Sequence, residues 1–231
     1  MKVVGVISSP RYDGNTATLV KEALKGAKEE GADITEIFLS KYKVEFCKGC
    51  LKCMKDGICP IADDFEALKT QLYNADAIIW GSPTYGGAFN AVMKNFFERL
   101  GNFARFTSSL GGKYMAVIST ASSSGAKKVA RNMASMVSDG IFKRVYLSNI
   151  LPILIHGQDI KSDPKILEKA RQLGKTVCRD IKENKKYPFQ NIFGRLINHF
   201  FVKPSLIQAI VTHKEDAMKA IYNNLRERKL I

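Results

Sequence analysis

The sequence predicts an α/β protein in which helices cover both faces of a five-stranded parallel sheet. Short runs rich in valine and isoleucine alternate along the first 150 residues with longer segments whose apolar residues recur at helical spacing. The short runs are apolar almost without interruption, as in strands that are buried on both faces. Clusters of glycine, proline, serine and aspartate separate the two kinds of segment, and this alternation is typical of a parallel sheet.

The expected elements follow one another in a regular order. The first helix is expected after a cap at Asn15 or Thr16, and a short helix after Asp63 and Asp64. A later helix is expected to begin with the pair Asp163 and Pro164, where the aspartate caps and the proline takes the first helical position. The expected strands are residues 2–8, 33–39, 76–80, 113–120 and 142–147. Further helical spacing covers residues 89–100 and 166–181, and another helix is expected after the Ser/Gly loop, to about residue 137.

The last part of the chain has a different pattern, which predicts a helical extension. We expect an α/β domain over residues 1–186 and an extension over residues 187–231, with one helix before Pro204 and one after it. The first of these helices carries an apolar stripe, too long to leave in water beside a small domain. We expect the stripe to lie in or near a homo-oligomer interface; packing on its own domain and binding to a membrane surface are the alternatives. Its residues are Phe189, Ile192, Phe193, Leu196, Ile197, Phe200 and Phe201.

Composition limits the class of protein. The 231 residues are 45% hydrophobic and 25% charged, which excludes disorder, collagen-like repeats and a small disulfide-stapled scaffold. We expect no signal peptide, no transmembrane segment and a cytoplasmic location. The net charge is +14, and residues 151–231 supply 16 of the 36 basic residues but only 8 of the 22 acidic ones. No nucleic-acid motif accompanies this charge, so no nucleic-acid partner is expected.

The loop after the first expected strand has the chemistry of a phosphate site. It contains Ser8, Ser9, Arg11, Asn15 and Thr16, and it leads into a helix N-terminus whose free N–H groups favour an anion. In a parallel sheet, ligands lie at this carboxyl end of the strands. The loop lacks the glycine pattern of dinucleotide sites and the Gly-Lys-Ser/Thr end of a triphosphate loop, so a phosphate monoester is favoured. A polar turn without a ligand is the alternative.

Two further loops are expected at the same sheet edge. Residues 81–87 combine Pro83, which fixes the backbone, with Gly86 and Gly87, which allow a flat ring to approach closely. Tyr85 is expected beside that ring, whereas Trp80 is expected in the core. Residues 120–125 would complete the rim. Three loops of small residues, one with anion-binding chemistry, fit flavin mononucleotide (FMN).

Four of the five cysteines are crowded into thirteen residues. Cys47, Cys50, Cys53 and Cys59 form a C-x2-C-x2-C-x5-C run, which can hold a single [4Fe–4S] cluster. Free thiols in a reducing compartment and a zinc site are the alternatives. Cys178 is expected to be an inert thiol in the core. The three histidines are scattered and no acid–base set is visible, so no catalytic side chain is assigned and the chemistry is expected to come from cofactors.

These motifs together resemble the flavodoxin-like NAD(P)H-dependent FMN reductase family, and in particular its iron–sulfur flavoprotein branch. The resemblance extends over residues 1 to about 185 and rests on Ser9-Pro10-Arg11, Gly14-Asn15-Thr16, the Gly81–Gly86 loop and the cysteine run. It implies a flavodoxin-like sheet of order 2-1-3-4-5 and an FMN-dependent oxidoreductase. It also implies FMN contacts from Ser9, Arg11, Asn15, Thr16, Pro83, Thr84, Tyr85 and Gly86. Thr120 and Ala121 are assigned to the same site on less support from the resemblance, because their loop lacks the family's usual glycine-rich form.

The expected activity is electron transfer from a reduced donor, NAD(P)H or ferredoxin, through FMN and a [4Fe–4S] cluster to an acceptor. A cluster-free NAD(P)H-dependent reductase of flavin or quinone is the first alternative, and a non-enzymatic binding or regulatory module is the second. Five lysines lie close to the cysteines, and they predict electrostatic docking of an acidic redox protein such as a ferredoxin. These lysines are Lys41, Lys43, Lys48, Lys52 and Lys55.

Overall fold

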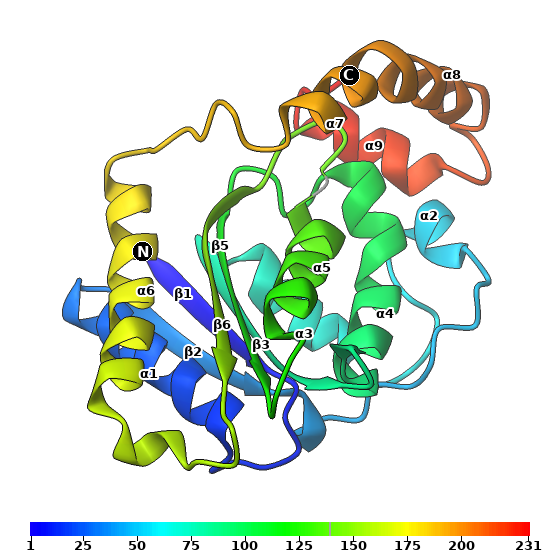
Figure 1. The fold of residues 1–231 in the computed structure, drawn as a ribbon. Helices are drawn as coiled ribbons and strands as arrows, with labels where there is room; N and C mark the ends of the chain where they lie inside the picture. The colour runs from blue at the N-terminus through cyan, green and yellow to red at the C-terminus, as the bar shows by residue number, and fades with distance from the viewer. Residues whose placement is uncertain (139) are drawn as a thin grey trace.

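A parallel sheet forms the centre of the computed structural model, which describes residues 1–138 and 140–231 (Figure 1). Its strands run in the order β2-β1-β3-β5-β6. The predicted fold class and the order of the five parallel strands are therefore confirmed. A sixth, very short strand was not expected: β4 pairs antiparallel with the end of β3. The strands are β1 (Lys2–Ile7), β2 (Asp33–Phe38), β3 (Ala77–Tyr85), β4 (Ala88–Phe89), β5 (Tyr114–Ala121) and β6 (Tyr146–Leu154).

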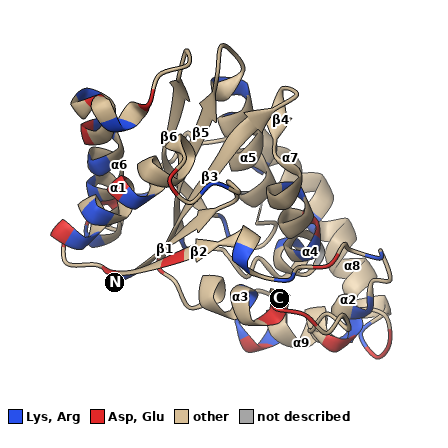
Figure 2. Ribbon diagram, turned by 90° about the horizontal axis from the view of Figure 1, so that it is seen from below, with Lys and Arg blue, Asp and Glu red and all other residues tan. Residues whose placement is uncertain are grey.

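Helices cover both faces of the sheet, as predicted. One face packs against α1 (Asn15–Glu29) and α6 (Pro164–Lys182), and these two helices carry many of the basic residues (Figure 2). The other face packs against α3 (Phe65–Tyr73), α4 (Ala91–Thr107) and α5 (Ala126–Ser138). Each face therefore has its own layer of buried aliphatic side chains, and the strands between them are buried on both sides.

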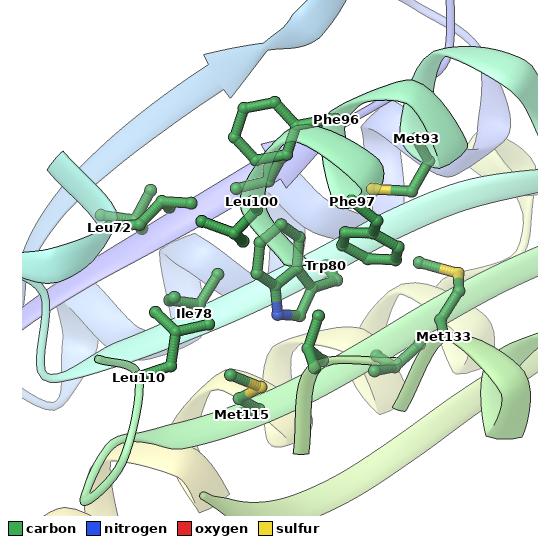
Figure 3. Packing of buried hydrophobic residues seen from close by; sticks show 14 of the residues in the cluster. Leu72, Ile78, Trp80, Met93, Phe96, Phe97, Leu100, Leu110, Met115 and Met133 are labelled. Atoms are coloured by element: carbon green, nitrogen blue, oxygen red, sulfur yellow. The ribbon is translucent and has the colours of Figure 1, made fainter. Parts of the chain in front are cut away.

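Trp80 lies at the centre of the layer between the sheet and α4, where the sequence places it (Figure 3). Its side chain is fully buried, and its ring meets the Phe97 ring edge-on at a centroid distance of 5.1 Å. Phe96 of α4 completes this aromatic group, with its own edge-on contact to Phe65 of α3. The position of the first turns of α4 over the sheet is thus fixed by large rings that interlock.

Several expectations about element bounds are wrong. The third strand is Ala77–Tyr85, not residues 76–80. The fifth parallel strand is residues 146–154, not 142–147. It pairs along the whole of β5, and a bulge beside Met115 and Ala116 breaks the simple alternation that marks a strand in sequence. The cap of α1 is Gly14, not Asn15 or Thr16, and no side chain caps this helix. The expected cap of α6 is confirmed, because the Asp163 carboxylate accepts bonds from the N–H groups of Lys165 and Ile166.

Residues after α6 form short helices that return to the α4 side of the molecule (Figure 1). The segment expected as one helix after Pro204 is broken at residues 213–218. The last two helices pack against α4 and against the small helix of the cysteine loop. Within the described residues, no helix is both long and apolar enough to cross a bilayer. The remaining elements are η1 (Leu39–Lys41), α2 (Lys52–Asp56), η2 (Ile160–Ser162), α7 (Ile192–Ile197), the π-helical turn η3 (Asn198–Val202), α8 (Lys203–Thr212) and α9 (Lys219–Glu227).

Candidate functional site

A large hollow lies at the carboxyl ends of the parallel strands, with a volume of about 930 Å³. It is lined by the loops after β1, β5 and β6 and by the C-terminal ends of β3 and β5. Of the ten residues predicted to contact FMN, the structure brings nine to this hollow: Ser9, Arg11, Asn15, Thr16, Pro83, Thr84, Tyr85, Thr120 and Ala121. Gly86 is absent from the lining; with a φ of +56°, it forms the turn between β3 and β4.

The N-terminus of α1 opens into this hollow without a side-chain cap. The first N–H groups of a helix have no partner within the helix, and they carry the positive end of its dipole. Ser9 shapes the loop before α1, because its Oγ accepts a hydrogen bond from the Arg11 N–H at 3.2 Å. The Arg11 side chain is exposed in the same hollow. Free N–H groups beside an arginine make this end of the hollow suitable for a phosphate.

Hydrogen bonds fix the loops to one another. Buried Thr16 at the start of α1 and Thr120 at the end of β5 are joined, with their hydroxyl oxygens 2.6 Å apart. The hydroxyl oxygens of Thr84 in β3 and Ser119 in β5 lie 3.1 Å apart and form a second hydrogen bond. Asn90 makes two contacts that the sequence does not predict. Its Nδ2 donates a hydrogen bond to the Ser8 carbonyl at 2.7 Å, and its Oδ1 caps α4. The rim is therefore organised by the protein itself before any ligand binds.

The loop of residues 155–159 was not predicted. Gly157, Gln158 and Asp159 line the hollow, and Asn15 Nδ2 donates to the Gln158 carbonyl at 3.3 Å. The loop was missed because the preceding strand was expected to end at residue 147. The apolar run from Ile150 to Ile155, followed by His156 and Gly157, was the available signal in the sequence.

The four clustered cysteines lie in a separate loop on the α4 side of the sheet. Cys50 is exposed, whereas Cys47, Cys53 and Cys59 are partly buried. Burial raises the pKa of Cys53, and the charges of Cys59, Cys47 and Cys50 raise it further. Sulfur donors of this kind fit iron chemically. However, the described residues contain no group of three or more His, Cys, Asp or Glu side chains arranged to hold a metal ion.

Cys178 behaves as predicted. It is fully buried between α1 and α6, and burial raises the pKa of its thiol to about 11. Its Sγ donates to the Ala27 carbonyl at 3.7 Å. It is a core thiol, remote from the cysteine loop.

A buried ion pair closes the base of the cysteine loop. Arg99 Nη1 lies 2.7 Å from Asp63 Oδ2 and also donates to the Glu45 carbonyl at 2.7 Å. Asp63 in turn accepts from the backbone N–H groups of Glu45 and Phe65. Residues 45 and 63, which flank all four cysteines, are thereby held together. The sequence predicts Asp63 only as a helix cap and indicates no role for Arg99.

Comparisons with known proteins agree with this geometry. The NADPH-dependent FMN reductase family model matches residues 1–153. An iron–sulfur flavoprotein of Methanocaldococcus jannaschii is 34% identical over 197 residues, which cover 80% of this chain and 100% of that protein. An iron–sulfur flavoprotein of Clostridioides difficile is 25% identical over 218 residues, or 93% of this chain and 95% of that one.

Solved structures support the fold. A flavone reductase superposes with a TM-score of 0.64 at 20% identity, over 80% of this chain and 64% of its own. At this identity the likeness concerns the fold alone.

Proposed function

The chain belongs to the NADPH-dependent FMN reductase family and is a flavin-dependent oxidoreductase, and on that premise we propose that it holds FMN in the hollow at the carboxyl ends of its strands. The observation that carries the proposal is the uncapped N-terminus of α1 beside Arg11 and Thr16. These groups would hold the phosphate. The backbone of Pro83 and Thr84 and the half-exposed Tyr85 would lie along the ring, with Thr120 and Ala121 at its edge.

The side chains of the hollow position and shield the flavin but include no acid–base or nucleophilic set. Bound FMN supplies the exchange between two-electron and one-electron transfer, for which no side chain is suited. Asn15 and Thr16 act at the phosphate end, and their contacts to Gln158 and Thr120 keep the loops at a fixed spacing. The donor we propose is NAD(P)H or a reduced ferredoxin.

We further propose a [4Fe–4S] cluster on Cys47, Cys50, Cys53 and Cys59. The name of the M. jannaschii relative supports it. The spacing of the four cysteines within thirteen residues supports it too, as does the buried Arg99–Asp63 pair that holds the two ends of their loop together. Such a cluster would exchange single electrons with a partner protein. The second candidate is a cluster-free NAD(P)H-dependent reductase of flavin or quinone, favoured by the lack of a formed ligand group among the described residues. The third is a binding module without turnover. We also propose a cytoplasmic location, because free thiols stay reduced in the cytoplasm.

An anaerobic purification tests the function in one series. FMN and iron are counted per chain, and absorption and EPR spectra are recorded. Arg11→Ala is expected to weaken FMN binding by about 1.5–3 kcal/mol, because it removes a charge-assisted bond to the phosphate. Lys28→Ala is the control and should leave FMN affinity unchanged, because Lys28 lies at the C-terminal end of α1, away from the phosphate end. Equal FMN affinity in both variants would contradict the site.

The second arm concerns iron. Any single serine substitution at Cys47, Cys50, Cys53 or Cys59 is expected to lower the iron content and bleach the broad visible absorption, while Cys178→Ser does neither. Wild-type protein that takes up no iron after reconstitution, yet oxidises NAD(P)H, identifies the cluster-free reductase. FMN binding without any turnover identifies the module.

We also propose two kinds of protein partner. The cysteine loop exposes Phe46, Leu51 and Ile58 among the lysines at positions 48, 52 and 55. An apolar centre inside a charged rim is typical of a transient interface and fits an acidic redox protein such as a ferredoxin.

The second partner is another copy of the chain. The apolar stripe of residues 189–201 is exposed along its length, which supports a homo-oligomer. We propose that the chain divides into a domain of residues 1–186 and an extension of residues 187–231.

A further inference from the structure

The C-terminal helices pack directly on the helix of the cysteine loop. Met54 of α2 and Phe103 of α4 join Ile210, Ile221 and Leu225 in a separate apolar cluster, and the last three are fully buried. Cys53, the residue before Met54, packs against this cluster. Figure 1 shows α9 lying beside both α2 and the upper end of α4.

The contact between α9 and α2 is close. Gly57 ends α2 with a φ of +78°, and a Cβ added there would lie 3.4 Å from the Ala220 Cβ. A methyl group at this position would thus just reach contact with α9, which lies directly beside the end of α2.

Arg228 anchors α9 to the core of the protein. Its guanidinium donates to the Thr107 carbonyl at 2.6 Å and to the Ser108 carbonyl at 3.0 Å. Thr107 is the last residue of α4 and Ser108 is its C-cap, so these carbonyls lie at the negative end of the α4 dipole. A cation there is favourable, and it ties the end of α9 to the end of α4.

Helix α2 depends on this packing. It has only five residues, begins after Leu51 in a left-handed conformation, and has no side-chain cap. A helix of this length is not stable alone in water. Met54 is its one buried residue, and it is buried in a cluster with side chains of α4, α8 and α9.

From these contacts we infer that α9 is a brace that positions Cys53 within the cysteine loop. The brace acts through Leu225, which packs in the cluster around Met54, and through Arg228, which holds α9 in place. Ile221 and Leu225 act only by positioning Cys53, because neither side chain can itself bind a metal ion. The use of the braced thiol for a cluster rests on the proposed function, but the bracing itself does not.

The test uses the full-length, FMN-loaded protein after a chelator has removed iron. Iodoacetamide labels the thiols, and peptide mass spectrometry gives a rate for each cysteine. In the wild type, Cys53 should react more slowly than exposed Cys50, and Cys178 should not react. Leu225→Ala and Arg228→Gln are each expected to raise the Cys53 rate about tenfold, because local opening of α2 becomes easier. Arg226→Gln, on the exposed side of the same helix, is the matched control and should change nothing.

Two results would overturn the brace. One is an unchanged Cys53 rate in both variants although hydrogen exchange shows that residues 219–231 have loosened. The other is a rise at Cys178 together with Cys53 in both variants, which indicates loss of the whole fold. Because the labelled protein contains no iron, failure of the cluster proposal leaves this result intact. Conversely, a wild type that binds no iron on reconstitution rejects the cluster without touching the brace.

Discussion

Arg99 and Asp63 form the most buried ion pair among the described residues, with 1% and 0% of their side chains exposed. Burying two charges costs several kcal/mol, so such a pair persists only when further hydrogen bonds satisfy it. Arg99 obtains one from the Glu45 carbonyl, and Asp63 obtains two from backbone N–H groups. The pair therefore joins α4 to both ends of the cysteine loop.

Asp63→Asn is expected to destabilise the fold by about 3–5 kcal/mol, because it leaves the Arg99 charge buried without a partner. Urea unfolding monitored by Trp80 fluorescence measures the change. Glu98 lies one residue before Arg99 on α4 and forms an exposed pair with Lys94; Glu98→Gln should cost no more than about 1 kcal/mol. Equal effects of the two substitutions would show that the buried pair is not special.

The same pair predicts a pH dependence. Burial alone would raise the pKa of Asp63, but the bonds from Arg99 and from the N–H groups of Glu45 and Phe65 outweigh it and lower the pKa. A lowered folded pKa means that the contribution is complete above the unfolded value, about 3.9, and is lost as the pH falls through the folded value. The stability difference between wild type and Asp63→Asn should therefore be constant above about pH 5 and shrink below about pH 4. A difference that grows on acidification is the contrary result.

At the scale of elements, two glycines set how closely α1 and α6 pack. A Cβ on Gly174 would lie 1.8 Å from the Ala23 carbonyl oxygen, and one on Gly26 would lie 2.0 Å from the Arg171 carbonyl oxygen. These neighbours are backbone atoms, so they cannot move aside as a side-chain end would. The helix layer on this face is therefore built on direct contact between backbones.

Gly174→Ala is expected to destabilise the protein by about 1–3 kcal/mol, because the helices must separate. Gly101→Ala is the matched control: Gly101 also lies inside a helix, but a Cβ there would meet nothing within 4 Å. That control should stabilise the protein by about 0.5–1 kcal/mol, since alanine is the better helix former. Opposite shifts in thermal midpoint are thus expected, and shifts of the same sign would be evidence against the close crossing.

At the scale of the molecule, the apolar stripe remains uncovered by its own chain. Phe189, Phe193 and Phe201 each expose at least 70% of their surface, although the same segment packs against the domain through Gln190 and Asn198. Phe193→Ser combined with Phe200→Ser is expected to reduce the mass in light scattering to that of one chain, 25.7 kDa. Phe46→Ser, at an exposed phenylalanine outside the stripe, should leave the mass unchanged. A wild type that is already monomeric would remove the oligomer proposal.

The charge of the cysteine loop predicts how electrons reach it. Steering by complementary charge weakens as salt shortens the Debye length, from about 30 Å at 0.01 M to about 8 Å at 0.15 M. Reduction by a ferredoxin should therefore slow with salt, whereas reduction by a neutral small donor should not. Lys48→Glu with Lys52→Glu should slow the ferredoxin reaction at low salt. If both donors respond to salt alike, or if the double variant reacts normally, the lysines are only solvated surface.

The sequence by itself determined the layers of the fold and most of the residues around the hollow. Apolar periodicity is a local property, and parallel strands bring their carboxyl ends to one edge, so Ser9, Pro83 and Thr120 could be grouped without coordinates. The loop of residues 155–159 was not predicted, because a bulge in β6 disturbs the apolar pattern from which the end of a strand is inferred.

Only the tertiary structure decided what surrounds the cysteines. Arg99 is 36 residues from Asp63, and Arg228 is 121 residues from Thr107, so no window of sequence contains either contact. The same holds for Met54, which the sequence places in a polar loop and which the structure buries against side chains of α4, α8 and α9. Such contacts depend on where helices end after the chain has packed, a non-local outcome that apolar spacing along the sequence does not encode.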